Sequence, residues 1–230
     1  PTFQLVFKNT IEFTLACLVV QFTIGFLFAM FFSKKFTLAG PIRGLVLVGY
    51  MMPMSVTALL GKNLFLLDGG VINDLLMKVH LISSPIDWLV NGGTALGAVI
   101  AVNCWVGIPF NMLLLTSGLT GISTDIYESA SMDGANAFKR FIYITLPLMK
   151  PAMLSVLMLG FIYTFKAFDL MYIMTAGGPF NSTDVLGTYA YSKAFTQYEF
   201  SQGSAIAMVL FACLFLVGIF YLKLLSKEDD

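Results

Sequence analysis

Charged side chains are scarce in this sequence. They make up 11% of its 230 residues, whereas hydrophobic residues make up 58%. A soluble domain carries about 25% charged residues, so this chain cannot cover itself with a polar surface. The mean hydropathy is +0.85. The formal net charge is zero, which argues against nucleic acid as a partner and against a basic helix lying on a membrane surface. The composition indicates an integral membrane protein.

Histidine and cysteine are also rare, which excludes several kinds of site. His80 is the single histidine, and it lies in a polar loop with no clustered ligands around it. The three cysteines, Cys17, Cys104 and Cys213, fall inside apolar runs without metal-like spacing, and their odd number argues against a disulfide set. No G-x-x-x-x-G-K-[ST] phosphate-binding loop is present. We therefore expect no catalytic residue, no metal site and no cofactor bound by this chain.

What the sequence does contain is a set of apolar runs long enough to cross a bilayer. We predict five membrane helices, at about 13–32, 44–60, 94–116, 151–174 and 204–222. These runs are too long and too evenly apolar for the alternating strands of a barrel, and helices satisfy their own backbone groups in lipid. The predicted fold class is an all-α membrane protein, a polytopic helical bundle with residues 1–230 as a single transmembrane domain.

The basic residues of the short loops predict the orientation of the bundle. One side would hold Lys34, Lys35, Arg43, Lys139, Arg140, Lys150, Lys223 and Lys227. The other side would hold Lys8, Lys62, Lys78 and Lys193. Eight against four places the loop at about 120–147 and the C-terminus in the cytoplasm, and the N-terminus outside. Because an external N-terminus without a signal sequence is unusual, we expect a sixth helix before Pro1 in the intact protein.

The loop at about 120–147 is polar yet patterned as ordered structure. Asp125 and Glu128 have the spacing of a capping box, which predicts a short helix over 126–133 with Asp125 as its cap. Gly134 supplies a break, and a second short helix is expected over 135–144. Pro147 and Pro151 would then turn the chain back into the membrane.

The spacing in this loop resembles that of a known family. Glu128 and Ala130 form an E-x-A pair, Gly134 follows six residues after Glu128, and I-x-L-P occupies 144–147. This pattern is similar to the cytoplasmic EAA loop of binding-protein-dependent ABC importers, with Ser129 in place of an alanine. The resemblance implies the type I permease fold of ABC importers and an ATPase-coupling surface made of Glu128, Ser129, Ala130, Asp133, Gly134, Ala135 and Pro147.

Further motifs narrow the resemblance to one branch of these permeases. They are Asn9-Thr10 at the first helix, G-V-I-N at 70–73, F-K-A-F-D at 165–169 and T-A-G-G-P at 175–179. Together they look like the maltose-type or glycerol-phosphate-type permease, one member of a heterodimeric pair.

Polar residues on the third run suggest where a substrate could pass. Asn103, Gly107 and Phe110 are spaced i, i+4, i+7 and therefore share one helix face. An amide, a gap and an aromatic ring suit a sugar. The alternative is that Asn103 and Gly107 serve helix packing, as amides and small residues often do.

In maltose-type permeases the midplane sugar site uses residues matching these three and several others. The resemblance therefore implies a substrate site of Tyr50, Met54, Asn103, Val106, Gly107, Phe110, Gly160 and Thr164. Tyr50, Asn103 and Gly107 keep the family pattern. The residues that depart from it are Met54, Phe110, Gly160 and Thr164, so a differently shaped pocket is expected.

Lys166 and Asp169 are spaced i, i+3 on the fourth predicted helix and can pair with each other. We predict a structural or gating pair near the external side. A proton relay is the weaker interpretation.

The resemblance implies a permease subunit of an ABC importer in the cell (cytoplasmic or inner) membrane, translocating a carbohydrate, a di- or oligosaccharide. Its expected partners are ABC ATPase subunits that bind ATP and Mg²⁺, a second homologous permease, an extracytoplasmic solute-binding protein and membrane lipid. One alternative is the same machinery carrying glycerol phosphate or another polyol. The other is an ion-driven secondary transporter, which would need buried carboxylates, and only Asp169 and Glu12 approach the required depth.

Overall fold

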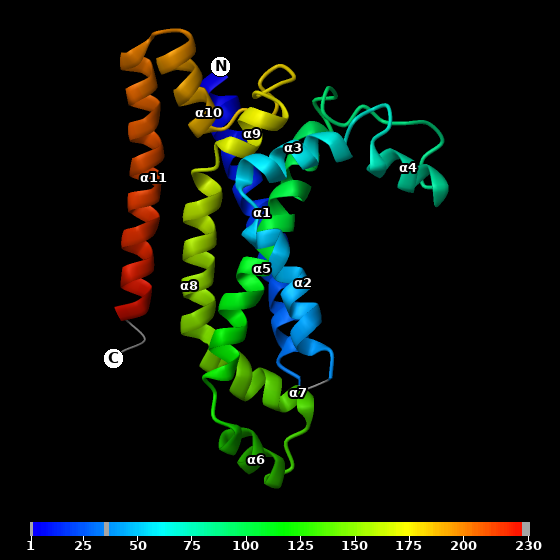
Figure 1. Cartoon of the computed structure of the whole chain (residues 1–230). Helices are drawn as coiled ribbons and strands as arrows, with labels where there is room; N and C mark the ends of the chain where they lie inside the picture. The colour runs from blue at the N-terminus through cyan, green and yellow to red at the C-terminus, as the bar shows by residue number, and fades with distance from the viewer. Residues whose placement is uncertain (1, 35–36, 227–230) are drawn as a thin grey trace.

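The computed structural model describes residues 2–34 and 37–226, and its regular structure in these ranges is helical, without strands. The predicted fold class is confirmed. Four long helices dominate Figure 1: α1 (Thr2–Phe32), α5 (Ala95–Thr120), α8 (Leu146–Phe165) and α11 (Phe200–Ser226). In the described ranges, four helical spans are long and apolar enough to cross a membrane, or up to five if one bent pair counts as a span.

The bent pair corresponds to the second predicted helix. α2 (Ala39–Met51) and α3 (Met54–Leu64) meet at 96°. Pro53 lies at the break and has no N–H to continue α2, and it restricts Met52 to extended backbone. The run expected over 44–60, which Pro53 interrupts, is therefore two helices, with α3 turned across the end of the bundle (Figure 1).

The continuous helix predicted over 151–174 is wrong. α8 ends at Phe165, and a separate short helix, α9, covers Asp169–Met174. Lys166 and Asp169 therefore do not share a helix, and no ion pair joins these two described residues. Lys166 instead places Nζ 5.3 Å from the ring centre of Tyr163. Lys166 and Asp169, the two charged residues of the run 151–174, were the available signal of this break.

At its other end α8 continues into the preceding loop. α7 (Ala137–Arg140) and η1, a π-helical turn over Phe141–Thr145, run into α8 as one helical span. The Leu146 N–H reaches back five residues to the Phe141 carbonyl just before Pro147, which has no N–H of its own. The second loop helix thus begins at Ala137 rather than 135, and Pro147 lies within the helix instead of ending it. The ribbon changes direction there (Figure 1).

The core lies mainly between α1 and α5. Phe13 and Cys17 of α1 pack with Val99 and Val102 of α5, and all four are buried. α11 stands outside this core, against α8 and α10 (Leu186–Tyr191), which is followed by a second π turn, η2 (Ser192–Thr196). Only 6% of the most apolar 18-residue stretch of α11 is buried, so the rest of the chain leaves most of this helix uncovered.

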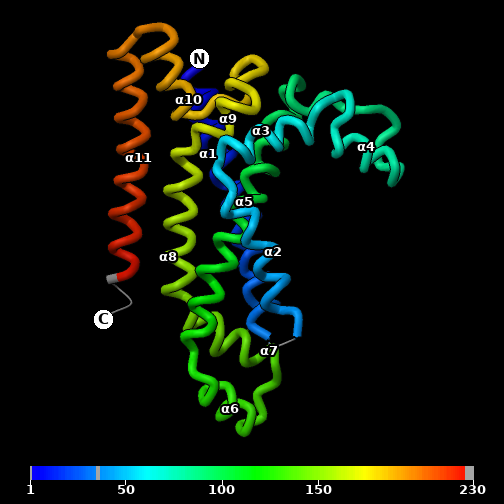
Figure 2. Tube along the Cα trace, viewed as in Figure 1, coloured from blue at the N-terminus to red at the C-terminus, as the bar shows by residue number. Residues whose placement is uncertain are grey.

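The two ends of the molecule separate the loops as the charge count predicts. α3, α4 (Val71–Lys78), α9 and α10 lie at the end that holds the N-terminus, whereas α6 (Thr124–Met132) and α7 lie at the other, toward which α11 descends (Figures 1 and 2). Lys35, Lys227 and Pro1 lie outside the described residues. Which end faces the cytoplasm stays a prediction.

Side-chain amides hold the loops at the N-terminal end. Asn73 is 1% exposed; its nitrogen donates to the carbonyls of Leu66, Leu67 and Ile86, and its oxygen accepts from Ile86 N–H and Trp88 Nε1. The G-V-I-N motif therefore has a structural role, because one buried side chain closes the segment between α3 and α5.

The Asn9-Thr10 motif acts in a similar way on the segment that follows α9. Asn9 Nδ2 donates to the carbonyls of Asn181 (2.8 Å) and Asp184 (3.1 Å). Thr10 Oγ1 accepts from the Leu186 N–H at 2.9 Å. These bonds join residues more than 170 positions apart in sequence and tie the T-A-G-G-P loop to α1.

Candidate functional site: a bundle cavity and an exposed elbow

A cavity of about 280 Å³ lies in the bundle between α1, α2, α3, α5 and α8. All eight predicted substrate-site residues line it, together with Gln21 and Tyr163. The structure thus brings together side chains from helices far apart in sequence. Their role in binding stays a prediction.

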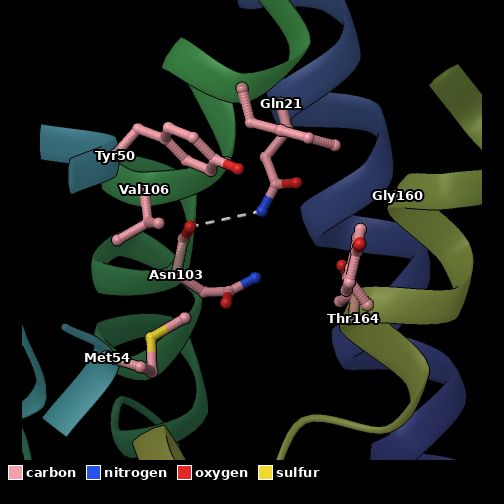
Figure 3. A pocket seen from close by; sticks show the side chains of 10 residues that line it. Gln21, Tyr50, Met54, Asn103, Val106, Gly160 and Thr164 are labelled. Atoms are coloured by element: carbon pink, nitrogen blue, oxygen red, sulfur yellow. Dashed lines mark hydrogen bonds between the residues drawn. The ribbon is translucent and has the colours of Figure 1, made fainter. Parts of the chain in front are cut away.

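Each wall of the cavity follows from the local structure of one helix. Asn103 and Val106 lie on the inner face of α5, as their helical spacing predicts (Figure 3). Tyr50, near the end of α2, and Met54, the first residue of α3, lie on either side of the bend at Pro53 and line the same cavity.

Aromatic rings form a series along the cavity. Tyr50 and Phe110 stack with ring centres 5.5 Å apart, and Phe110 meets the edge of Tyr163 at 5.7 Å. Tyr163 was not predicted. Gly160, Tyr163 and Thr164 stand at positions i, i+3 and i+4, so they share one helix face. This spacing could have identified Tyr163 from the sequence.

The polar groups of the cavity are uncharged. Its ten lining residues include amides, hydroxyls and aromatic rings but no Asp, Glu, Lys or Arg. A ligand held here would meet hydrogen-bonding groups and apolar ring faces. A charged ligand would find no opposite charge among these residues.

Gln21 was also missed by the sequence analysis. It is 4% exposed, and its Nε2 donates to the backbone carbonyl of Asn103 at 3.3 Å (Figure 3). The signal available in the sequence was a polar amide in the middle of a predicted membrane span, because polar groups inside a membrane span are costly.

The packing alternative for Gly107 is also supported. A Cβ at Gly107 would overlap the amide of Gln21, so the glycine gives α1 and α5 room to approach. Asn111 Nδ2 donates to the Gly107 carbonyl at 2.8 Å, and this amide serves the helix itself. Gly107 therefore both lines the cavity and permits helix packing.

The predicted coupling loop is an elbow that projects from one end of the bundle (Figure 1). α6 has no buried residue, and Glu128, Ser129 and Asp133 are exposed. Ala130 and Ala135 are half-buried, and Pro147 is exposed farther along, at the start of α8. The elbow also exposes large apolar side chains, with Met132 84% and Phe138 69% exposed.

The predicted cap of this helix is wrong. The N-cap of α6 is Ser123, whose Oγ accepts from the Asp125 N–H at 3.2 Å, so Asp125 lies in the first turn. Serine is as good a cap as aspartate. Gly134 does end the helix as expected, with φ +78°, a left-handed conformation with open space around it. Glycine is needed there for the backbone angle rather than for room.

Hydrogen bonds join the elbow to the membrane helix above it. The hydroxyls of Tyr127 on α6 and Thr145 on η1 lie 2.9 Å apart. Arg140 Nη1 donates to Ser131 Oγ at 2.7 Å, and that hydroxyl donates to the Tyr127 carbonyl at 2.6 Å. We call these four residues the elbow brace. They hold α6 to the π turn that leads into α8.

The fold and the exposed elbow define a membrane-spanning transport component. Residues 21–227 match the family described as the binding-protein-dependent transport system inner membrane component. The chain belongs to this family.

Relatives with a similar sequence are named as permease proteins of transport systems. The chain is 31% identical over 188 residues to a probable ABC transporter permease protein of Brucella suis, covering 82% of this chain but 65% of that protein. It is also 31% identical over 214 residues to the trehalose/maltose transport system permease protein MalF of Thermococcus litoralis, covering 93% of this chain and 72% of that one. The sulfoquinovosyl glycerol transport system permease protein SmoG of Agrobacterium fabrum is 31% identical over 229 residues, covering 100% of this chain and 74% of that protein.

The fold also occurs in solved structures. A bacterial ABC transporter involved in the import of the acidic polysaccharide alginate has a chain that superposes with a TM-score of 0.89 at 19% identity. The match covers 100% of this chain and 81% of that one. At this identity the likeness establishes the shared fold.

Proposed function

We propose that this chain is a permease subunit of an ABC importer that moves a neutral carbohydrate, a di- or oligosaccharide, across the cell membrane. The observation that carries the proposal is the convergence of Tyr50, Met54, Asn103 and the other predicted residues on one cavity. Family membership supports the transport role, and the trehalose/maltose and sulfoquinovosyl glycerol relatives support a carbohydrate cargo.

The chemistry of the cavity supports a neutral sugar over a phosphorylated one. Sugars bind through hydroxyls that exchange hydrogen bonds with amides and through C–H faces that pack on aromatic rings, and both kinds of group are present. Lys166 lies over the ring of Tyr163, with Nζ 5.3 Å from the ring centre, but it does not line the cavity. Glycerol phosphate therefore lacks a charged partner among the lining residues.

An ion-driven mechanism finds little support. Neither Glu12 nor Asp169 lines the cavity. Glu12 pairs with Lys8 at 3.3 Å while remaining about half exposed. A coupling ion would need buried carboxylates along its path, and Asp184, which is 8% exposed, does not line the cavity either.

In the proposed mechanism, separate ATPase subunits bind ATP and Mg²⁺ and dock on the cytoplasmic elbow. Glu128 and Asp133 offer exposed charge, and Met132 and Phe138 offer apolar surface for that contact. A second permease completes the transmembrane pathway, and a solute-binding protein delivers sugar at the opposite end. ATP shifts the two states of the assembly only if it binds one of them more tightly.

The first test is a mild-detergent pull-down of the tagged chain from its own cells, followed by mass spectrometry. We expect an ATPase with a phosphate-binding loop and a second permease. Purified in this way and placed in vesicles, the complex should take up sugar only with ATP. Recovery of the chain alone, with uptake that needs no ATP, would replace the importer with a secondary transporter.

A variant test examines the elbow. Glu128→Ala combined with Gly134→Asp should release the ATPase and abolish uptake while the chain still reaches the membrane. Wild-type uptake by this variant would refute the docking role.

A further inference from the structure

Gln21 is buried in α1, with an amide that α1 alone cannot satisfy. A polar side chain in a membrane span is costly unless it has a partner or faces a polar cavity. Gln21 does both, because it lines the bundle cavity and bonds to α5. α1 thereby contributes to a cavity whose eight predicted residues all come from α2, α3, α5 and α8.

The bond to α5 fixes which way the Gln21 amide faces. The partner is the backbone carbonyl of Asn103, 3.3 Å away, and a carbonyl oxygen can only accept. The nitrogen of Gln21 must therefore be the atom turned toward α5. Its Oε1 is left to face elsewhere, and Figure 3 shows this oxygen turned away from the bonded carbonyl.

Gly107 keeps the amide in this place. A Cβ at residue 107 would clash with the Cδ, Oε1 and Nε2 atoms of Gln21. The amide therefore lies directly against the backbone of α5, beside the side chain of Asn103 (Figure 3). Two amides from two helices thus border the same uncharged space, opposite Gly160 and Thr164 of α8.

We propose that Gln21 is a substrate-binding and specificity-determining residue, whose Oε1 accepts a hydrogen bond from a hydroxyl group of the transported sugar. The proposal rests on the proposed function for the identity of the ligand. The Oε1 atom of Gln21 would be an acceptor held in a fixed orientation. It would strengthen the binding of a sugar that places a hydroxyl donor there, and would not strengthen the binding of an analogue without that hydroxyl. Such sites discriminate strongly, because the missing hydroxyl leaves a buried polar group unpaired.

One experiment tests the placement without knowledge of the cargo. The three natural cysteines are replaced by alanine in the complete transporter, and Gln21→Cys is compared with Thr14→Cys, which is 1% exposed two turns away on α1. A negatively charged methanethiosulfonate should modify Gln21→Cys and spare Thr14→Cys. An unreactive thiol at position 21 throughout the ATP cycle would overturn the proposal.

A second experiment tests recognition in proteoliposomes. The probe is maltose if it is transported, or else the first sugar taken up from a panel of radiolabelled mono- and disaccharides. Gln21→Leu should raise the KM for uptake by about tenfold or more, as expected for a lost buried hydrogen bond. Its maximal rate and sugar moved per ATP should change far less. Thr14→Val, the matched control on α1, should leave the KM unchanged.

Deoxy derivatives of the same sugar separate binding from packing. One deoxy derivative should bind the wild type more weakly than the parent sugar does. In Gln21→Leu the same derivative and the parent sugar should have similar KM values. A KM unchanged by Gln21→Leu, or equal losses for every derivative in both proteins, would refute the proposal. If no sugar of the panel is taken up, the carbohydrate cargo is refuted, while thiol modification still decides whether Gln21 faces the cavity.

Discussion

Asn73 shows how much one buried side chain can contribute outside the membrane core. Its amide holds Leu66, Leu67, Ile86 and Trp88 in place through both of its polar atoms. Asn73→Ala should destabilise the segment 61–88 by about 3 kcal/mol, taking roughly 1 kcal/mol for each of three well-placed hydrogen bonds. Hydrogen exchange and limited proteolysis of the purified complex would measure this.

Asn63→Ala is the matched control for that change. Asn63 is exposed and makes one bond, to the Leu59 carbonyl of its own helix at 2.8 Å. We expect protection of 61–88 to remain close to that of the wild type. Equal losses in the two variants would show that Asn73 has no special role.

Gly134 is the second position at which a single residue controls the local structure. Gly134→Ala forces a Cβ into a left-handed backbone conformation, at a cost of about 1–2 kcal/mol. The elbow should distort, and less ATPase should remain bound during purification. Gly134→Asn should be milder, since asparagine visits this conformation more readily.

Gly40→Ala supplies the control, because Gly40 also has open space around it and lacks the positive φ. It should bind ATPase normally. ATPase binding by Gly134→Ala at wild-type strength would contradict the need for glycine at this angle.

At the scale of elements, the elbow brace connects α6, the proposed docking helix, to the membrane helix α8. Tyr127→Phe and Thr145→Val each remove the same hydroxyl contact between α6 and η1. If this contact transmits motion, each should lower the sugar transported per ATP hydrolysed, and the double variant should be little worse than either single one. The expected coupling energy is about 1 kcal/mol.

Thr145→Ser keeps the hydroxyl and should restore coupling. Tyr198→Phe, at an exposed tyrosine beyond η2, should have no effect. Fully additive effects of Tyr127→Phe and Thr145→Val would mean that the brace does not act as one unit.

At the scale of the whole molecule, the loops segregate to two ends, and the charge bias assigns those ends to the two sides of the membrane. Cysteine labelling tests this assignment. Met132→Cys lies in the elbow and Leu81→Cys lies beyond α4, both at sites at least 72% exposed. A membrane-impermeant maleimide should label Leu81→Cys in intact spheroplasts and Met132→Cys only after lysis. The reverse pattern would invert the predicted orientation and remove the elbow from the cytoplasmic ATPase.

Prediction from the sequence succeeded where the relevant pattern is local. The face shared by Asn103, Gly107 and Phe110 follows from helix periodicity, and all three line the cavity. It failed at the end of α8, where two charged residues were taken as part of one continuous membrane helix. The segment around Lys166 reads as continuous helix, yet α8 ends at Phe165. A run of hydrophobic residues reports burial in lipid and says little about where one helix stops and the next begins.

Gln21 and Tyr163 illustrate the same limit within the site. The family resemblance supplied cavity residues from four helices, but not the amide on α1. Contact between Gln21 and Asn103 spans 82 positions in sequence. It depends on the close approach of α1 and α5, which Gly107 permits and which no local pattern encodes.

The sequence by itself determined the class of this protein, its helical fold and the position of its exposed polar elbow, because hydropathy and short-range spacing are properties of neighbouring residues. The tertiary structure alone decided the 96° angle at which α2 and α3 meet, the continuation of the elbow into α8 through a π turn, and the place of Gln21 in the cavity. These features arise from how whole helices break and pack against one another, and that packing joins residues which the sequence keeps far apart.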